Sequence, residues 1–166
     1  QTSDWLEEEM KDKTNGGYYA ALDADSEGVE GKFYTWTKDE LKDILGKEFD
    51  WFSEYYNVND NGYWEDERYI LLRKSDDDSF AKTIGMDNES FSEKLKSLHN
   101  ELLNVRRKRV SPGLDDKKIT SWNALLLKGL VDAGTTLKNS QLLDSSNDLA
   151  NWIIDNVWDE ANQKLL

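Results

Sequence analysis

The clearest pattern of apolar and polar positions lies in the second half of the chain. Apolar residues recur there at intervals of four and three, at Phe91, Leu95, Leu98, Leu102 and Val105. This spacing places them on one face of an α-helix and predicts a helix over 90–109. The basic residues at 106–109 then stand at its C-terminal end, where the helix dipole favours positive charge.

The same spacing predicts two further long helices, over 120–138 and 140–157. The first would turn these side chains inward: Trp122, Leu126, Leu130, Ala133 and Leu137. The second would bury Leu142, Leu149, Trp152, Ile153 and Val157. Weaker patterns predict shorter helices over 4–13, 38–45, 47–56 and 78–84. Long helices joined by short turns are typical of an array of helical hairpins.

Local signals sharpen some of these boundaries. Thr37 followed three residues later by Glu40 predicts a capping box at the start of the helix over 38–45. The pair Gly16 and Gly17 is expected to end the first helix, because glycine tolerates the left-handed C-terminal cap. One or two short strands are expected, at 32–36 and within 63–72.

The segment 16–37 departs from the helical pattern. It holds four glycines and five aromatic residues among several acids. A plain connection between helices needs only about 2–8 residues. A longer acidic and aromatic connection is where a binding or catalytic site is expected. The candidates in it are Asp23, Asp25, Glu27, Tyr34 and Trp36.

The acids of this loop admit three interpretations. Asp23, Asp25 and Glu27 resemble the opening of a calcium loop, but Tyr34 stands where such a loop needs a bidentate acid. We therefore assign no metal and no cofactor. An acidic turn bonded to its own backbone is one alternative. Contact with a sugar is the other, because a carboxylate can accept two hydroxyl protons while aromatic rings cover the sugar face.

A second acidic segment comes directly before the helix over 120–138. Asp115, Asp116 and Lys117 could supply a general acid or base whose pKa is tuned by its neighbours. The alternative is negative charge that complements the helix dipole. Trp122 is expected in the core, with ligand contact as its alternative, and Asn123 could bond a ligand.

Composition excludes several classes of function. The net charge of −13 argues against nucleic acid and disfavours anionic membranes as partners. The sequence has no run of 18 apolar residues, so no membrane span is predicted. The sequence has no cysteine, which fits the cytoplasm. Its one histidine, His99, is expected to be solvated or satisfied, so no histidine-based triad is predicted.

Three blocks of sequence together resemble a known family. The first is the run GGYYAALDADSEGVEGKFYTWT at 16–37. The second comprises Tyr55, Tyr56, Val58, Gly62, Trp64, Glu65, Ile70 and Leu71. The third comprises Arg106, Arg109, Pro112, Asp115, Asp116, Lys117, Thr120, Ser121, Trp122 and Asn123. They resemble the YyaL family, also called spermatogenesis-associated thioredoxin-domain proteins. Tyr69 and Ala124 depart from the family pattern, in which Asn and Gly are usual.

The resemblance implies a mainly α fold. Members of the family resemble one another in a thioredoxin-like domain followed by an (α/α)6 toroid of the six-hairpin glycosidase kind. Residues 1–166 match a middle part of that toroid, and we expect the thioredoxin-like domain and the remaining helices to lie outside this fragment. The length agrees, because twelve helices of about 11–12 residues plus loops need about twice as many residues.

Two functions follow as hypotheses. The first is a carbohydrate-active domain, glycosidase- or epimerase-like, in which Asp25 and Asp116 are the catalytic candidates. Its substrate contacts would be Asp23, Glu27, Tyr34, Trp36, Asp115, Lys117, Trp122 and Asn123. The second is a non-catalytic scaffold that serves the attached thioredoxin-like domain. We expect the fragment alone to be inactive, and its exposed apolar surface to favour self-association and to bind the rest of its own chain.

Overall fold

The computed structural model describes residues 2–165, which are mainly helical with several short two-stranded sheets. The chain divides into two compact units. The central unit spans Ala24–Gly113, and the terminal unit joins the residues up to Asp23 with those from Leu114 onward. The mainly helical class predicted from the sequence is confirmed. The closed toroid stays a prediction.

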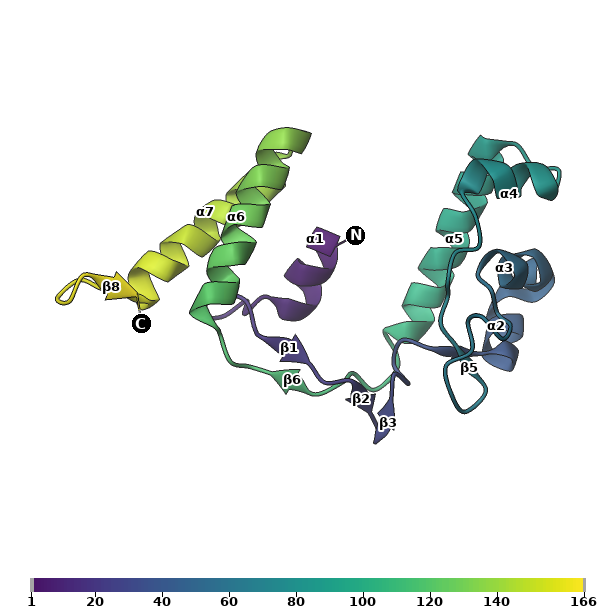
Figure 1. Cartoon of the computed structure of the whole chain (residues 1–166), viewed down its shortest axis with the longest axis horizontal. Coiled ribbons are helices and arrows are strands. Elements are labelled where there is room, and N and C mark those ends of the chain that lie inside the picture. Colours follow the sequence, from purple (N-terminus) through teal and green to yellow (C-terminus); the bar gives the residue numbers. More distant parts are fainter. Residues whose placement is uncertain (1, 166) are drawn as a thin grey trace. The chain divides into compact units, whose positions relative to one another are not determined.

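A helical hairpin forms about half of the terminal unit. Helices α6 (Thr120–Leu137) and α7 (Ser140–Asn156) lie side by side (Figure 1). Lys138 adopts a left-handed conformation between them, and the side chain of Asn139 caps α7. The core of the unit is formed by buried side chains of these helices and of the N-terminal segment: Met10, Tyr18, Leu130, Leu149, Ile153 and Val157.

The inward face of α6 differs from the expected one at both ends. Trp122 is 54% exposed and Leu137 is 70% exposed, so the prediction that they face inward is wrong. The buried stripe instead runs through Asn123, Leu130 and Gly134. Gly134 belongs to it because a Cβ there would stand 2.8 Å from the side chain of Leu143 on α7. Close packing of the two helices thus decides which face is inward.

The first helix ends earlier than expected. Helix α1 (Thr2–Trp5) continues into the π-helical turn η1 (Leu6–Met10) and stops there. The Asp12 carboxylate then accepts hydrogen bonds from the backbone N–H groups of Thr14 and Asn15, which folds the chain into a tight turn. The helix therefore ends before the pair of glycines that we expected to end it.

Gly16 and Gly17 have another role in this turn. Both have a φ of +75°, which other residues rarely adopt. A Cβ would stand 2.8 Å from the indole of Trp152 at Gly16 and 2.7 Å from it at Gly17. These glycines thus allow the backbone to lie against the aromatic ring of α7.

Short strands tie the remaining backbone of the terminal unit together. Strands β1 (Ala21–Leu22) and β6 (Leu114–Asp115) pair antiparallel, with Ala21 opposite Asp115 (Figure 1). Near the C-terminus, β7 (Trp158–Asp159) pairs with β8 (Lys164–Leu165). The pairing of β1 with β6 matters for the site, because it brings the backbone of Asp115 to the segment that follows Tyr19.

The central unit packs four helices around aromatic side chains. They are α2 (Lys38–Leu45), α3 (Phe49–Tyr55), α4 (Asp77–Thr83) and α5 (Asn88–Arg106), with the 3₁₀ turn η2 (Gly46–Glu48) between the first two. The predicted stripe of α5 is confirmed, since Phe91, Leu95, Leu98 and Leu102 are buried and Val105 packs against them. The predicted capping box is also confirmed, with the Thr37 hydroxyl accepting from the N–H of Glu40 at 3.1 Å.

Two-residue strands complete the central unit. They are β2 (Asp25–Ser26), β3 (Val29–Glu30), β4 (Trp36–Thr37) and β5 (Arg68–Tyr69), paired β2 with β3 and β4 with β5. The expected strand over 32–36 is wrong except at its last residue, because a turn closed by the N–H of Tyr34 on the carbonyl of Gly31 takes its place. None of the described helices is long and apolar enough to cross a membrane.

Candidate functional site

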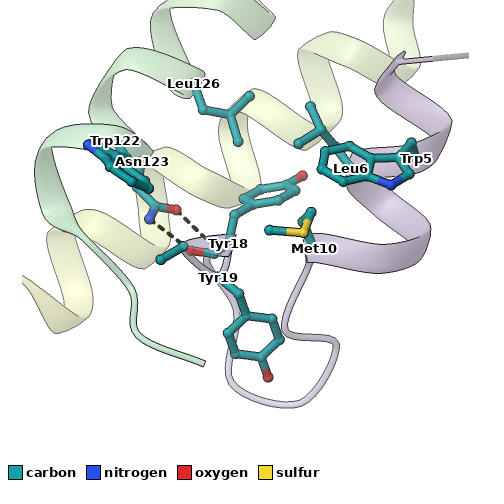
Figure 2. A pocket seen from close by; sticks show the side chains of 9 residues that line it. Trp5, Leu6, Met10, Tyr18, Tyr19, Trp122, Asn123 and Leu126 are labelled. Atoms are coloured by element: carbon teal, nitrogen blue, oxygen red, sulfur yellow. Dashed lines mark hydrogen bonds between the residues drawn. The ribbon is translucent and has the colours of Figure 1, made fainter. Parts of the chain in front are cut away.

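An aromatic hollow of about 200 Å³ lies in the terminal unit between the N-terminal helix and α6. Figure 2 shows the side chains around it. Its lining is mainly apolar and aromatic: Trp5, Leu6, Met10, Tyr18, Tyr19, Ala20, Trp122, Asn123 and Leu126. We call this the terminal hollow. Two of the candidates predicted from the sequence, Trp122 and Asn123, line it.

Tyr18 forms the floor of the terminal hollow. Its side chain is buried, and its hydroxyl donates a hydrogen bond to the carboxylate of Glu7. Burial raises the pKa of the Tyr18 phenol, and the bond to Glu7 raises it further. Burial alone would raise the pKa of Glu7, but hydrogen bonds from Tyr18 and Lys11 outweigh it and lower that pKa. The pair is therefore a neutral phenol on a charged carboxylate at neutral pH.

Asn123 joins α6 to the backbone of Tyr18. Its Oδ1 accepts from the N–H of Tyr18 at 2.8 Å, and its Nδ2 donates to the carbonyls of Tyr18 at 3.0 Å and of Ile119 at 3.1 Å. The side chain is 3% exposed. Both amide protons are used in these bonds, which leaves one lone pair of Oδ1. The role of Asn123 in ligand binding stays a prediction, whereas its structural role is evident from these bonds.

Trp122 is exposed because Asn123 points inward. Successive residues of an α-helix are rotated by about 100°, so a buried Asn123 turns its neighbour towards the rim. Figure 2 places Trp122 on the α6 side of the hollow and Trp5 on the side of the N-terminal helix. Exposed indole rings beside a hollow are suited to cover an apolar ligand face.

The acids before α6 are held close to this region. The carbonyl of Asp115 accepts from the N–H of Ala20 at 3.3 Å, which extends the pairing of β1 with β6. The carboxylate of Asp115 accepts from the ammonium of Lys117 at 2.9 and 3.0 Å, and this lowers the pKa of Asp115. The pKa of Tyr19 is raised mainly by burial and by Asp12, and the charge of Asp116 adds to it.

A buried ion pair in the same unit was not predicted. The Nζ of Lys118 lies 2.7 Å from Oδ2 of Asp12, and its ammonium stands 5.6 Å from the ring centre of Tyr19 and 5.4 Å from that of Trp152. The bond from Lys118 lowers the pKa of Asp12 well below its usual range. No sequence spacing links two residues so far apart, and no local pattern marks either as half of an ion pair.

The remaining acids predicted from the 16–37 segment are exposed. Asp23 directly follows β1 in the terminal unit. Asp25 belongs to β2 of the central unit, opposite Glu30. Glu27 pairs with Lys32 at 2.8 Å. The catalytic pairing of Asp25 with Asp116 stays a prediction.

The aromatic candidates of the central unit both meet arginines. Tyr34 is half-exposed, with the guanidinium of Arg106 5.4 Å from its ring centre. Trp36 is 3% exposed, and the guanidinium of Arg109 lies 3.9 Å from its ring centre. Trp36 therefore packs in the core of the central unit. Its role in binding substrate stays a prediction.

The last candidates concern metal ligands and the histidine. Residues 2–165 contain no group of three or more His, Cys, Asp or Glu side chains that could hold a metal ion. The Nε2 of His99 lies 2.6 Å from the hydroxyl of Tyr56, so this histidine is satisfied as expected. Burial lowers the pKa of His99, and the nearby charge of Arg73 lowers it further.

Comparison with known proteins gives relatives but no family model that matches. The chain is 32% identical over 162 residues to the uncharacterised protein B0495.5 of Caenorhabditis elegans, an alignment that covers 84% of this chain. It is 25% identical to the spermatogenesis-associated protein 20 of Homo sapiens and to that of Rattus norvegicus, over 92% and 91% of this chain. In each case it spans 22% of the relative's length. The chain is therefore homologous to about one fifth of these longer proteins.

Proposed function

We propose that this chain forms part of a carbohydrate-active domain, glycosidase- or epimerase-like, within a longer (α/α) toroid. The observation that carries the proposal is the terminal hollow with exposed Trp122 in its lining, in the same unit as the acids that precede α6. The hairpin of α6 and α7 fits a toroid, which is built from such units. The homology to one fifth of longer proteins fits a domain completed by other segments of the same chain.

The chemistry of the terminal hollow suits a sugar. A sugar ring has apolar faces that pack on aromatic side chains, and hydroxyl groups around its edge that bond to carboxylates. Trp122 and Trp5 supply the exposed aromatic surface. Asp115 and Asp116 supply carboxylates on the segment paired with β1. The two requirements are thus met within one unit.

The ion pair with Lys117 bears on the role of Asp115. Because Lys117 lowers the pKa of Asp115, this carboxylate stays charged at neutral pH and is unsuited to donate a proton. Asp115 would instead accept hydroxyl protons or stabilise positive charge. Glycoside cleavage needs two carboxylates about 5–10 Å apart across the sugar. We propose Asp116 as one of the two, and Asp25 stays the second candidate on the grounds of the sequence alone.

A scaffold that serves a thioredoxin-like domain is the second candidate. It is favoured by apolar side chains exposed on the helical hairpin, namely Leu125, Val131, Leu137 and Ile154. Such side chains fit contact with another domain, and a scaffold needs no carboxylate of shifted pKa. The same surface would support self-association of this chain in isolation.

Calorimetric titration of the full-length protein with a panel of mono- and disaccharides separates the two functions. We expect at least one sugar to bind, and Trp122→Ala to weaken that binding about tenfold through lost ring contact. Leu125→Ala, which also removes an exposed apolar side chain of α6, is the control and should leave binding unchanged. Asp116→Asn should reduce binding or turnover with little change in stability. The scaffold would be favoured if the full-length protein binds no sugar and Leu125→Ala loosens the contact with the attached thioredoxin-like domain, measured by amide hydrogen exchange.

A further inference from the structure

A second cavity, of about 290 Å³, lies in the central unit. It is lined by Ser26, Glu27, Lys32, Phe33, Glu40, Arg68, Lys108, Arg109 and Val110. Four of these side chains are basic and two are acidic, in a protein whose net charge is −13. We call it the arginine cavity. Its charge is opposite to that of the molecule as a whole.

Two arginines of the cavity hold the turn at residues 31–35. Nη1 of Arg109 donates to the carbonyls of Lys32, Phe33 and Thr35 at 3.1, 3.0 and 2.8 Å. Nη2 of Arg68 donates to the carbonyl of Thr35 at 2.8 Å. Both side chains are largely buried, at 15% and 13% exposed. The turn and the two guanidinium groups thus form a preorganised structure rather than a mobile surface patch.

One carboxylate stands against these charges. Glu40 bonds Arg109 at 3.1 Å through one oxygen and Arg68 at 3.3 Å through the other. Arg106 adds a third guanidinium, 5.7 Å from the ring centre of Phe33, and its Nε is buried without a hydrogen-bond partner. Burial lowers the pKa of Arg109, and Arg68 and Arg106 lower it further against the opposing effect of Glu40. Glu27, the other acid of the lining, pairs with Lys32 at 2.8 Å, so the four basic residues of the cavity still outnumber its two acids.

The helix dipole does not account for this arrangement. Basic residues after a helix stabilise its last carbonyls, and the run at 106–109 stands in that place. Arg109, however, donates to the turn at residues 31–35 and to Glu40 rather than to the end of α5. Arg68 belongs to β5 and joins the same group. Basic side chains from two distant elements therefore line one cavity.

We propose that the arginine cavity binds a small oxyanion, the phosphate or carboxylate group of a ligand. The hydrogen bonds of Arg68 use Nε and Nη2, so Nη1 is the donor that would reach the anion. Lys108 lines the cavity from an exposed position and would supply a second charged donor. Charge-assisted bonds of this kind are among the strongest that a protein makes to an anion. The proposal does not depend on sugar binding at the terminal hollow.

The test is calorimetric titration of the full-length protein with inorganic phosphate and with succinate at low ionic strength. Saturable binding of either probe is expected, and the probe that binds identifies the group the ligand carries. Lys108→Glu should weaken that binding about tenfold. Lys96→Glu makes the same charge change on an exposed residue of α5 outside the cavity and should leave binding within twofold of the unchanged protein.

Three results would overturn the proposal. The first is that neither phosphate nor succinate binds saturably. The second is that both charge reversals weaken binding equally, which would indicate the general field of the protein. The third is that Lys108→Gln, with an unchanged thermal midpoint, binds as well as the unchanged protein. Loss of sugar binding has no bearing on any of these results, so the two proposals can fail separately.

Discussion

Replacing Asn123 by alanine tests how the terminal hollow is built. The buried amide is the partner of both the N–H and the carbonyl of Tyr18. Alanine removes those partners and leaves two backbone groups buried and unpaired. The carbonyl of Ile119 also loses a bond, but it keeps the N–H of residue 123 at 3.0 Å. The cost therefore comes mainly from Tyr18.

The magnitude follows from these two groups. An unsatisfied buried donor or acceptor costs about 1–3 kcal/mol, so two of them predict a loss of about 2–6 kcal/mol in the free energy of unfolding. The backbone of Tyr18 also carries the side chain that forms the floor of the hollow. We therefore expect the variant to lose both stability and the shape of the site.

Urea unfolding followed by circular dichroism measures the loss, and amide hydrogen exchange locates it. The N–H of Tyr18 should be protected in the unchanged chain and should exchange freely in Asn123→Ala. Asn151→Ala makes the same chemical change at an exposed position of α7 and should stay within about 0.5 kcal/mol. A loss below about 1 kcal/mol for Asn123→Ala, with Tyr18 still protected, would refute this account of the hollow.

Further predictions concern the packing and the titration of the rest of the chain. Leu98→Ala should lower the free energy of unfolding by about 2–5 kcal/mol, whereas Leu125→Ala at an exposed position should change it little, both measured by urea unfolding. Gly17→Ala should destabilise more than Gly28→Ala in the same assay, because both have a φ of +75° but only Gly17 has a ring 2.7 Å from the added Cβ. The lowered pKa of His99 predicts an NMR titration midpoint below 6.5. The contribution of the neutral imidazole to the free energy of unfolding should be complete above pH 6.5 and should be lost as the pH falls through the midpoint. A midpoint at or above 6.5 would contradict the assigned burial.

The sequence predicted what local patterns determine. The predicted stripe of α5 and the capping box at Thr37 are both confirmed, because a helical period and a cap depend on residues three or four apart. The mainly helical class followed from the same patterns. The end of the first helix was wrong, because the carboxylate of Asp12 folds the chain through bonds that no periodicity announces.

The site was predicted in part, for a related reason. Trp122 and Asn123 were singled out, but Trp122 was expected in the core and is exposed, whereas the burial of Asn123 was not predicted. Polar burial of Asn123 is stabilised by bonds to Tyr18, a residue 105 positions away. The pair of Asp12 with Lys118 has the same long-range character. Contacts between distant segments are what the sequence pattern could not provide.

The most direct measurement of the central claim is a crystal structure of the full-length protein soaked with the sugar that binds best in the calorimetric panel. We expect the sugar in the terminal hollow, with a ring face on Trp122 and hydroxyl groups within hydrogen-bond distance of Asp115 or Asp116. A sugar bound elsewhere would contradict it. So would a hollow filled by another segment of the chain that covers Trp122, since the exposed indole would then be an interface within the protein rather than a binding surface.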